Sequence, residues 1–253
     1  MKDKKVLTEG NEGYETVVFL PPAGQSRYYW SPFLEELSDD FHTVAVELPG
    51  HYDHPTDKFD MEQAVDETVS IMDKYGPVVL VGYSLGGHVA AKAVKQVDSE
   101  LVKGMVVMGA TQDLSQTSYR VMGTVLKRGA PVLELAGKSE KFTEWFVNKF
   151  SESEKPDSQD PPEEIESDPI ATTAGVWRTF SEIETREIIK EHSLPVHIIH
   201  GEEEMGLEDS QDLAEKQENA EITVLPGKDH SKLGFYEEET VDLMRDFASK
   251  CVE

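Results

Sequence analysis

Short apolar runs, rich in valine and isoleucine, recur along the chain. Glycine or proline bounds each run, which is typical of strands that are buried on both faces of a sheet. The runs that predict strands cover residues 15–20, 42–48, 77–83, 102–110, 195–201 and 220–227. Apolar residues at helical spacing lie between several of these runs. In the segment that ends at Gly76, for example, Met61, Val65, Val69 and Met72 share one helical face.

The alternation of strands and helices predicts a three-layer α/β fold, with a mostly parallel sheet and helices on both faces. Residues 112–190 interrupt this alternation, because they contain no strand pattern. The helix-like pieces in this region cover residues 118–129, 130–137, 141–150 and 173–183. We therefore expect residues 1–111 and 191–253 to form the core and residues 112–190 to form a helical cap insertion. An acidic, proline-rich stretch at 151–169 is expected to be an exposed loop of that cap.

Net charge narrows the range of partners. The 253 residues include 50 acidic and 24 basic ones, which gives a net charge of −26. Nucleic acids and anionic membranes would be repelled by such a chain. Lysine supplies 18 of the 24 basic residues, whereas we expect extreme salt adaptation to deplete lysine. A solvated acidic surface is therefore the preferred interpretation.

The chain has a single cysteine, Cys251, so no disulfide can form within it. This composition fits a reducing compartment. Residues 1–20 lack an apolar core of signal-peptide length, and no run approaches the ~20 apolar residues of a membrane span. We therefore expect a cytoplasmic protein without a membrane partner. The sequence leaves its oligomeric state open.

The clearest chemical motif is Gly-Tyr-Ser-Leu-Gly at residues 82–86, between a predicted strand and a predicted helix. A strand that reverses so tightly into a helix leaves no room for side chains beside the corner. The corner residue, Ser84, would be held at strained backbone angles with its hydroxyl exposed at a helix N-terminus. There the N–H of Leu85 is placed to stabilise an oxyanion. The alternative is that Ser84 merely caps the helix.

With its surroundings, this motif resembles the α/β-hydrolase family, and the likeness extends over nearly the whole chain. Four pieces carry it: "FLPPAGQSRYYWSPFLEEL", "HTVAVELPGH", "VVLVGYSLGGHVA" and "VHIIHGEEEMG" with the later "ITVLPGKDHSKLG". The resemblance implies the α/β-hydrolase fold. It also implies a nucleophile, an acid and a late histidine, in that order along the chain.

The resemblance places the general base at His230, on the polar loop "LPGKDHSKLG" after the last predicted strand. The other histidines have weaker cases. His88 follows Ser84 by one helical turn and is expected to pack within its helix. His51 and His54 lie in the loop after "ELPG", at the edge where they are candidates for lining the site.

The acid that orients the histidine is less certain from the sequence. The family usually carries it a few residues after the strand that ends in "HG", and Glu204 matches this position best. Aspartate is the commoner residue there, but glutamate offers the same chemistry on a longer arm. Asp113, after the preceding core strand, occupies a place that some members use. Both alternatives stay open at this point.

A second oxyanion donor is expected in the turn after the first predicted strand, which reads Pro-Pro-Ala-Gly-Gln-Ser from Pro21 to Ser26. The resemblance assigns this role to the backbone N–H of Ala23, since neither proline has an N–H to donate. Locally, the turn is similar to that of the type II thioesterases, which edit carrier proteins. Those enzymes have a histidine where this chain has Pro22.

Aromatic residues are candidates for the substrate pocket, although they are more often core residues. The pocket candidates are Tyr83, Tyr28 and Trp177. Within the predicted cap, Met122, Leu126, Trp145 and Phe146 could join Trp177 in an apolar acyl pocket. They could equally form the small core of the cap.

The leading hypothesis is a serine hydrolase that cleaves a carboxylic ester or thioester through an acyl-enzyme. The partner would be a small acyl ester or thioester, of which the acyl and leaving groups remain open. The same residues could instead serve C–C bond hydrolysis, a lyase reaction or perhydrolysis, and a non-catalytic ligand-binding protein is a third possibility. The sequence contains no metal signature or P-loop, and "GYSLGG" lacks dinucleotide-binding spacing, so no cofactor is expected.

Overall fold

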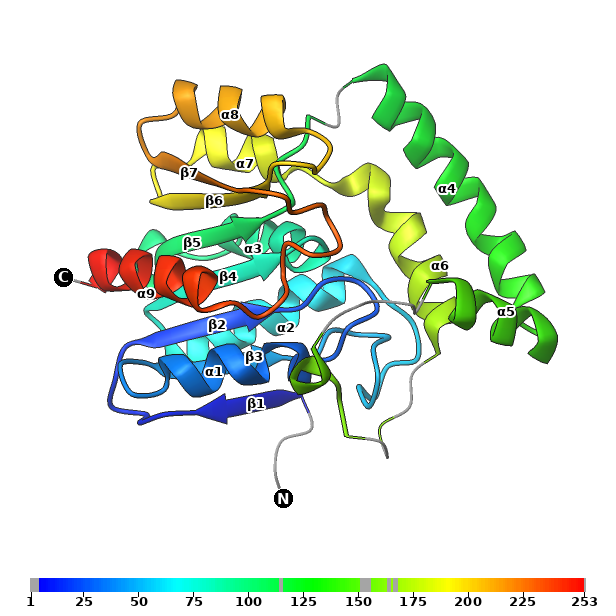
Figure 1. Cartoon of the computed structure of the whole chain (residues 1–253), viewed down its shortest axis with the longest axis horizontal. Coiled ribbons are helices and arrows are strands. Elements are labelled where there is room, and N and C mark those ends of the chain that lie inside the picture. Colours follow the sequence, from blue (N-terminus) through cyan, green and yellow to red (C-terminus); the bar gives the residue numbers. More distant parts are fainter. Residues whose placement is uncertain (1–4, 114–115, 151–155, 163–164, 166–167, 253) are drawn as a thin grey trace.

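The computed structural model describes residues 5–113, 116–150, 156–162, 165 and 168–252. Within these ranges, one seven-stranded sheet has the order β1-β3-β2-β4-β5-β6-β7 (Figure 1). The strands are β1 (Val6–Glu9), β2 (Thr16–Leu20), β3 (His42–Val46), β4 (Val78–Tyr83), β5 (Val102–Met108), β6 (Val196–Gly201) and β7 (Ala220–Leu225). Only β1 pairs antiparallel, with β3, and all other neighbouring strands are parallel. The predicted mostly parallel sheet is confirmed.

Among the strands in the described ranges, β1 is the one that the sequence analysis missed. It lies at an edge of the sheet, and its last two residues, Thr8 and Glu9, are exposed. The inner strands are different, because both of their faces are covered. Val18 and Leu20 of β2 pack on one side of the sheet, while Val17 and Phe19 pack on the other. A continuous apolar run is therefore the signature of an inner strand but not of this edge strand.

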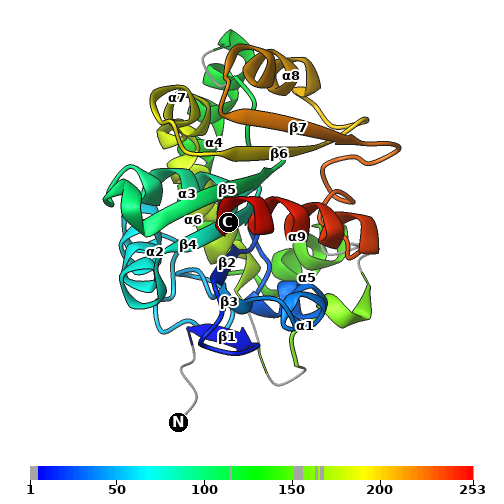
Figure 2. The same ribbon diagram turned by 90° about the vertical axis from the view of Figure 1, so that its left-hand side faces the viewer.

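Helices cover both faces of the sheet. Their bounds are α1 (Ser31–Leu37), α2 (Met61–Tyr75), α3 (Leu85–Val94), α4 (Thr117–Ala136), α5 (Glu140–Phe150), α6 (Pro169–Thr179), α7 (Thr185–Glu191), α8 (Leu207–Lys216) and α9 (Glu238–Val252). Figure 2 shows α2 and α3 on one face and α1 and α9 on the other. Residues of α7 and α8 join the same core cluster as those of α2 and α3. The fold is thus the three-layer α/β arrangement predicted.

The segment between β5 and β6 holds α4, α5, α6 and α7. The first three lie to one side of the sheet (Figure 1) and share a small core of their own. That core is formed by Ala130, Leu133, Phe146, Ile170 and Ala174. By contrast, α7 packs on α3 and contributes Ile188 and Ile189 to the main core. The division of the chain at residues 111 and 190 stays a prediction.

Helix α4 is longer than the sequence analysis predicted. The two expected pieces, 118–129 and 130–137, form one helix that runs through Pro131. Ala130 and Leu133, on either side of this proline, are buried in the small core against α6. Tertiary packing here outweighs the loss of one backbone donor, which ordinarily favours a break.

The acidic, proline-rich stretch is anchored at one residue. Residues 151–155, 163–164 and 166–167 lie outside the described residues. Gln159 is fully buried, whereas the prediction for this stretch was an exposed loop. Its amide donates to the carbonyls of Tyr29 and Gly234 at 3.1 and 3.0 Å, and its Oε1 accepts from the N–H of Tyr236 at 3.1 Å. An amide with three such partners is satisfied inside the fold, a possibility that composition does not reveal.

None of the helices in the described ranges is long and apolar enough to cross a membrane.

Candidate active site

Ser84 occupies the corner between β4 and α3 in a backbone conformation that few residues adopt. Its φ and ψ angles are 51° and −115°. A positive φ costs a non-glycine residue of order 1–3 kcal/mol and persists only where the surroundings enforce it. Here the N–H of Ser84 donates to the carbonyl of Met108 at 2.8 Å, which ties the corner to β5. The strained serine expected from the motif is present.

The glycines of the motif have the steric role expected of them. A Cβ on Gly82 would lie 2.5 Å from the carbonyl oxygen of Gly86. A Cβ on Gly86 would collide with the carbonyl of Leu20, at the end of β2. Both obstacles are backbone atoms, which cannot rotate away as a side chain can. The corner can therefore form only because these positions carry no side chain.

The loops after β4, β6 and β7 bring together the serine, the glutamate and the histidine. Ser84 Oγ lies 3.0 Å from His230 Nε2, and Glu204 Oε1 is hydrogen-bonded to His230 Nδ1. The side chain of His230 is half exposed, whereas only 2% of the Glu204 side chain is exposed. Donation from Nδ1 to the carboxylate leaves Nε2 unprotonated and able to accept the serine proton.

Glu204 is itself held in place from the strand that precedes it. The N–H of Gly201, the last residue of β6, donates to Glu204 Oε2 at 3.3 Å. His200 Nδ1 lies 3.5 Å from the same oxygen, and Gln112 Nε2 lies 3.5 Å from Oε1. A buried carboxylate needs such partners, since its charge is costly to leave uncompensated.

Asp113, the other candidate acid, contacts a residue of α8 through its backbone. Its backbone N–H donates to Asp209 Oδ2 at 3.1 Å, near the start of α8. His230 Nδ1 is already occupied by Glu204. The geometry therefore favours Glu204 over Asp113 as the partner of the histidine.

Gly109 is a site residue that the sequence analysis missed. It directly follows β5 and has a φ of 57°. A Cβ there would lie 2.7 Å from Glu204 Oε1 and 3.0 Å from His230 Nδ1. The glycine thus makes room for the pair that it faces. A glycine directly after a core strand was the available signal, but its reason appears only once β5, β6 and β7 lie side by side.

The turn after β2 lies beside the serine corner, because Leu20 of β2 is in register with Gly82 of β4. Pro21 and Pro22 are buried and Ala23 is exposed, and Gln25 N–H donates to the carbonyl of Pro22 at 3.2 Å. Ala23, whose N–H is the expected second oxyanion donor, is thus an exposed residue of this turn, next to the serine corner.

A buried arginine anchors the far end of this turn. The Arg27 guanidinium contacts Glu47 Oε2 at 2.7 Å and Asp53 Oδ1 at 2.5 Å. Arg27 and Glu47 are both buried, and burial raises the pKa of the Glu47 carboxyl above its ordinary value. These ion pairs join the turn after β2 to the loop after β3. They help to hold the backbone of the turn that contains Ala23 in place.

A cavity of about 470 Å³ opens at Ser84 and His230. Its remaining walls combine apolar and acidic side chains with His88 from α3. The other lining residues are His88, Gly109, Gln112, Tyr119, Met122, Phe180, Glu203, Glu204, Met205, Asp229 and Ser231. A substrate that enters this cavity would meet the serine hydroxyl directly.

The sequence model of the alpha/beta hydrolase family matches residues 17–243, which is most of the chain. The chain belongs to this family. Among solved structures, MenH from S. aureus is similar, with a TM-score of 0.78 at 19% identity over 99% of this chain and 100% of that one. The comparison with curated proteins found no match to this chain.

Two further solved structures show the same fold. A thermophilic esterase from Thermogutta terrifontis has a TM-score of 0.76 at 16% identity, over 97% of this chain and 93% of that one. The N-acyl homoserine lactonase AidH has a TM-score of 0.68 at 19% identity, over 98% and 93% of the two chains. At this level of identity the similarity shows the fold of this chain.

The three aromatic pocket candidates lie away from this cavity wall. Tyr83 is buried beneath the His230 loop, where its hydroxyl donates to the carbonyl of His230. Tyr28 stacks against Arg27, with the guanidinium carbon 4.7 Å from the ring centre. Trp177 packs on the small core of α4, α5 and α6. None of the three is among the described residues that line the cavity at Ser84.

Of the cap residues that were candidates for an acyl pocket, some lie in the small core or on the surface, and one lines the cavity. Phe146 belongs to the small core, and Trp145 is 55% exposed on α5. Met122 lines the cavity. The cap therefore contributes fewer apolar residues to the cavity than the sequence offered.

The other candidate histidines have different surroundings. His51 is buried, with Nδ1 2.9 Å from the carbonyl of Pro49, and burial lowers its pKa to about 4. His54 Nε2 lies 2.9 Å from Glu67 Oε2. Neither belongs to the described lining of the cavity, but His88 does. The expectation that His88 packs within its helix is therefore incomplete, because this side chain reaches the cavity.

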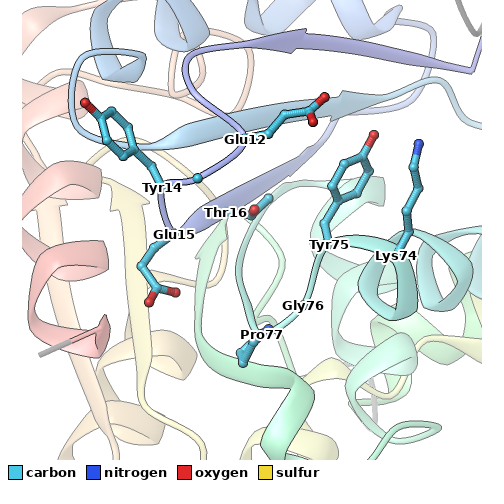
Figure 3. A pocket seen from close by; sticks show the side chains of 9 residues that line it. Glu12, Tyr14, Glu15, Thr16, Lys74, Tyr75, Gly76 and Pro77 are labelled. Atoms are coloured by element: carbon cyan, nitrogen blue, oxygen red, sulfur yellow. The ribbon is translucent and has the colours of Figure 1, made fainter.

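A second hollow lies at the other end of the strands, where β2 and β4 begin (Figure 3). Its volume is about 490 Å³, slightly more than that of the cavity at Ser84. Lys74 and Tyr75 stand on one side of it, with the lysine nitrogen 4.5 Å from the centre of the tyrosine ring. Its described lining contains no serine, cysteine or histidine. Chemistry rather than volume therefore selects the cavity at Ser84 as the candidate active site.

In the described part of the chain, no three histidine, cysteine, aspartate or glutamate side chains are grouped so that they could hold a metal ion.

Proposed function

We propose that this alpha/beta hydrolase cleaves a carboxylic ester or thioester through an acyl-enzyme on Ser84. The observation that carries the proposal is the chain of contacts from Ser84 Oγ to His230 Nε2, at 3.0 Å, and from His230 Nδ1 to the buried Glu204 carboxylate. A serine hydroxyl is a weak nucleophile at its free pKa and becomes reactive when a positioned base accepts its proton.

In the proposed reaction, His230 Nε2 takes the proton from Ser84 as Oγ attacks the carbonyl carbon. The imidazolium that forms is stabilised by Glu204, whose carboxylate is 2% exposed and therefore little screened by water. His230 then returns the proton to the departing alcohol or thiol. Water then attacks the acyl-enzyme while His230 Nε2 takes its proton. The bond between the acyl carbon and Ser84 Oγ breaks, His230 returns the proton to Oγ, and the acid is released.

The developing oxyanion would be held by the N–H groups of Leu85 and Ala23. Leu85 is the first residue of α3, so its N–H has no partner within the helix and lies at the positive end of the helix dipole. Ala23 lies in the turn after β2, anchored through Arg27. Loss of one such donor ordinarily lowers kcat by about 10²–10³-fold.

The first test uses a fluorophosphonate probe and p-nitrophenyl esters. We expect the probe to label the protein at Ser84, and turnover and labelling to vanish in Ser84→Ala. Ser70→Ala is the matched control, because Ser70 is exposed on α2 and bonds only to the carbonyl of Asp66 among the described residues. Absence of labelling in folded wild-type protein would contradict the proposal.

A substrate panel then separates the finer alternatives. Short- and long-chain nitrophenyl esters report esterase activity, and acyl-CoA thioesters report thioesterase activity. If the probe labels Ser84 and none of these substrates turns over, the residues serve another reaction, such as C–C bond hydrolysis. Ligand binding without any labelling or turnover would instead favour a non-catalytic protein.

A further inference from the structure

The charges around the cavity at Ser84 are of one sign. Glu203, Glu204 and Asp229 belong to its wall, and none of the described lining residues is a lysine or an arginine. Hydrogen bonds from Ser231 and from the backbone N–H of Lys232 lower the pKa of Asp229 below its ordinary value. Asp229 is therefore ionised at neutral pH. The charge of Lys232, which also lowers the pKa of Asp229, lies beside the wall, but Lys232 is not among the described lining residues. A carboxylate on the bound acyl group would therefore meet an acidic lining that repels it.

Outside the Ser84, His230 and Glu204 group, the described lining side chains that can donate a hydrogen bond are those of His88, Gln112, Tyr119 and Ser231. The Gln112 amide already donates to the carbonyl of Gly109 and the Ser231 hydroxyl to Asp229, whereas His88 carries a ring N–H. It lies one helical turn after Ser84, on the same face of α3. Its Nδ1 is 2.7 Å from the hydroxyl oxygen of Thr185, the first residue of α7. Nε2 is the ring nitrogen that this contact leaves available, and the His88 side chain lines the cavity.

The environment of Thr185 identifies the protonated nitrogen. Thr185 is only 2% exposed, and His88 is its hydroxyl's partner among the described residues. A buried hydroxyl needs an acceptor for its proton, and His88 Nδ1 supplies it. The proton of the neutral imidazole is then on Nε2. Burial, together with the nearby His230, lowers the pKa of His88 to about 3, so the ring stays neutral at physiological pH.

We propose that the preferred substrate has an uncharged acyl group with a carbonyl or similar oxygen that accepts a hydrogen bond from His88 Nε2. This inference rests on the proposed function and adds a substrate class and a specificity residue to it. The oxygen would lie along the acyl chain, away from the carbonyl that Ser84 attacks. A carboxylate could accept the same hydrogen bond, but the acidic wall opposes its charge.

Three methyl esters of similar length test the proposal. They are methyl 4-oxopentanoate, which carries a second carbonyl, methyl pentanoate, which lacks it, and monomethyl succinate, which has a carboxylate in its place. Acid release in a pH-stat gives kcat/KM for each. A single hydrogen bond predicts that wild-type protein favours the oxo ester over pentanoate by about 3- to 10-fold. We expect monomethyl succinate to be the poorest of the three.

Variants assign the preference to His88. In His88→Leu the ratio of oxo ester to pentanoate should fall to about 1, and in His88→Gln, whose amide N–H approximates Nε2, part of it should return. Intrinsic differences between the esters cancel, because the same pair is compared in each variant. His192→Leu is the matched control, since His192 lies outside the described cavity lining, and it should keep the wild-type ratio.

A binding measurement separates failure of this inference from failure of the proposed function. Calorimetric titration of Ser84→Ala protein with the same three esters reports affinity without turnover. If wild-type protein cleaves neither these esters nor the acyl-CoA thioesters, the proposed function fails, but tighter binding of the oxo ester that is lost with His88→Leu would still support the cavity inference. An unchanged ratio in His88→Leu, or a preference for monomethyl succinate, would overturn the inference.

Discussion

At the residue scale, the identity and burial of the acid give the site its character. Glu204 stands where aspartate is commoner in the family that the chain resembles, and its longer arm reaches His230 from the loop after β6. Gly109 leaves the space that this arm requires. The carboxylate is nearly fully buried, so it acts on the imidazolium with little screening.

The two candidate acids can be separated by neutral substitutions of equal size. Glu204→Gln keeps the shape of the side chain but removes the charge that fixes the histidine tautomer. We expect kcat for a p-nitrophenyl ester to fall by about 10³–10⁴-fold. Asp113→Asn should retain kcat within about threefold. The reverse order of the two variants in steady-state kinetics would assign the role to Asp113.

At the element scale, the close approach of α3 to β2 makes the corner possible. Gly86, in the first turn of α3, faces the backbone at the end of β2, and Gly87 faces Ala110 after β5. The same approach brings the turn that contains Ala23 beside Ser84. Helix α3, strand β2 and the turn after β2 therefore pack against one another without space for a further side chain. A side chain inserted between them would disturb this packing and move the proposed oxyanion donors.

Gly86→Ala tests the close packing of α3 on β2. The added methyl would meet the carbonyl of Leu20, so we expect a loss of about 3 kcal/mol in the free energy of unfolding, measured with urea. Gly13→Ala is the control, because the nearest atom to its added Cβ is the side-chain oxygen of Asn11 at 3.3 Å. Equal stability of the two variants would contradict the steric argument.

At the scale of the whole molecule, the acidic excess opposes folding. With 50 acidic and 24 basic residues, exposed carboxylates outnumber the cations that could pair with them. Several of the ion pairs that do form are exposed, such as Lys216–Asp212. Each of these contributes little to the free energy of unfolding. Repulsion among the remaining charges is longer in range than these pairs and is reduced by salt.

Ionic strength should therefore stabilise the protein. Raising NaCl from 0.02 to 0.5 M screens more repulsion than attraction, and we expect an increase in Tm of about 2–4 °C, which corresponds to about 1 kcal/mol. Differential scanning calorimetry measures it. Glu218→Lys, on the exposed surface before β7, should raise Tm at low salt and reduce the increment. A Tm that falls with salt would show that ion pairs dominate.

Local patterns in the sequence were enough for the parallel sheet and the serine corner. Strands buried on both faces leave continuous apolar runs, and a strand-to-helix reversal needs Gly82, Ser84 and Gly86 at fixed spacing. The edge strand Val6–Glu9 left no such run, since it is only half covered. The continuity of α4 through Pro131 was also unpredictable, because it depends on packing against α6.

From the sequence by itself, the Gly-Tyr-Ser-Leu-Gly motif predicted Ser84 as the nucleophile, and the family resemblance predicted His230 as its base. The tertiary structure decided which carboxylate faces His230, why Gly109 has no side chain, and that His88 rather than Tyr83 or Trp177 lines the cavity. These are contacts between loops that lie far apart in the chain. Their geometry depends on neighbouring strands in the folded sheet, and local residue patterns carry no record of it.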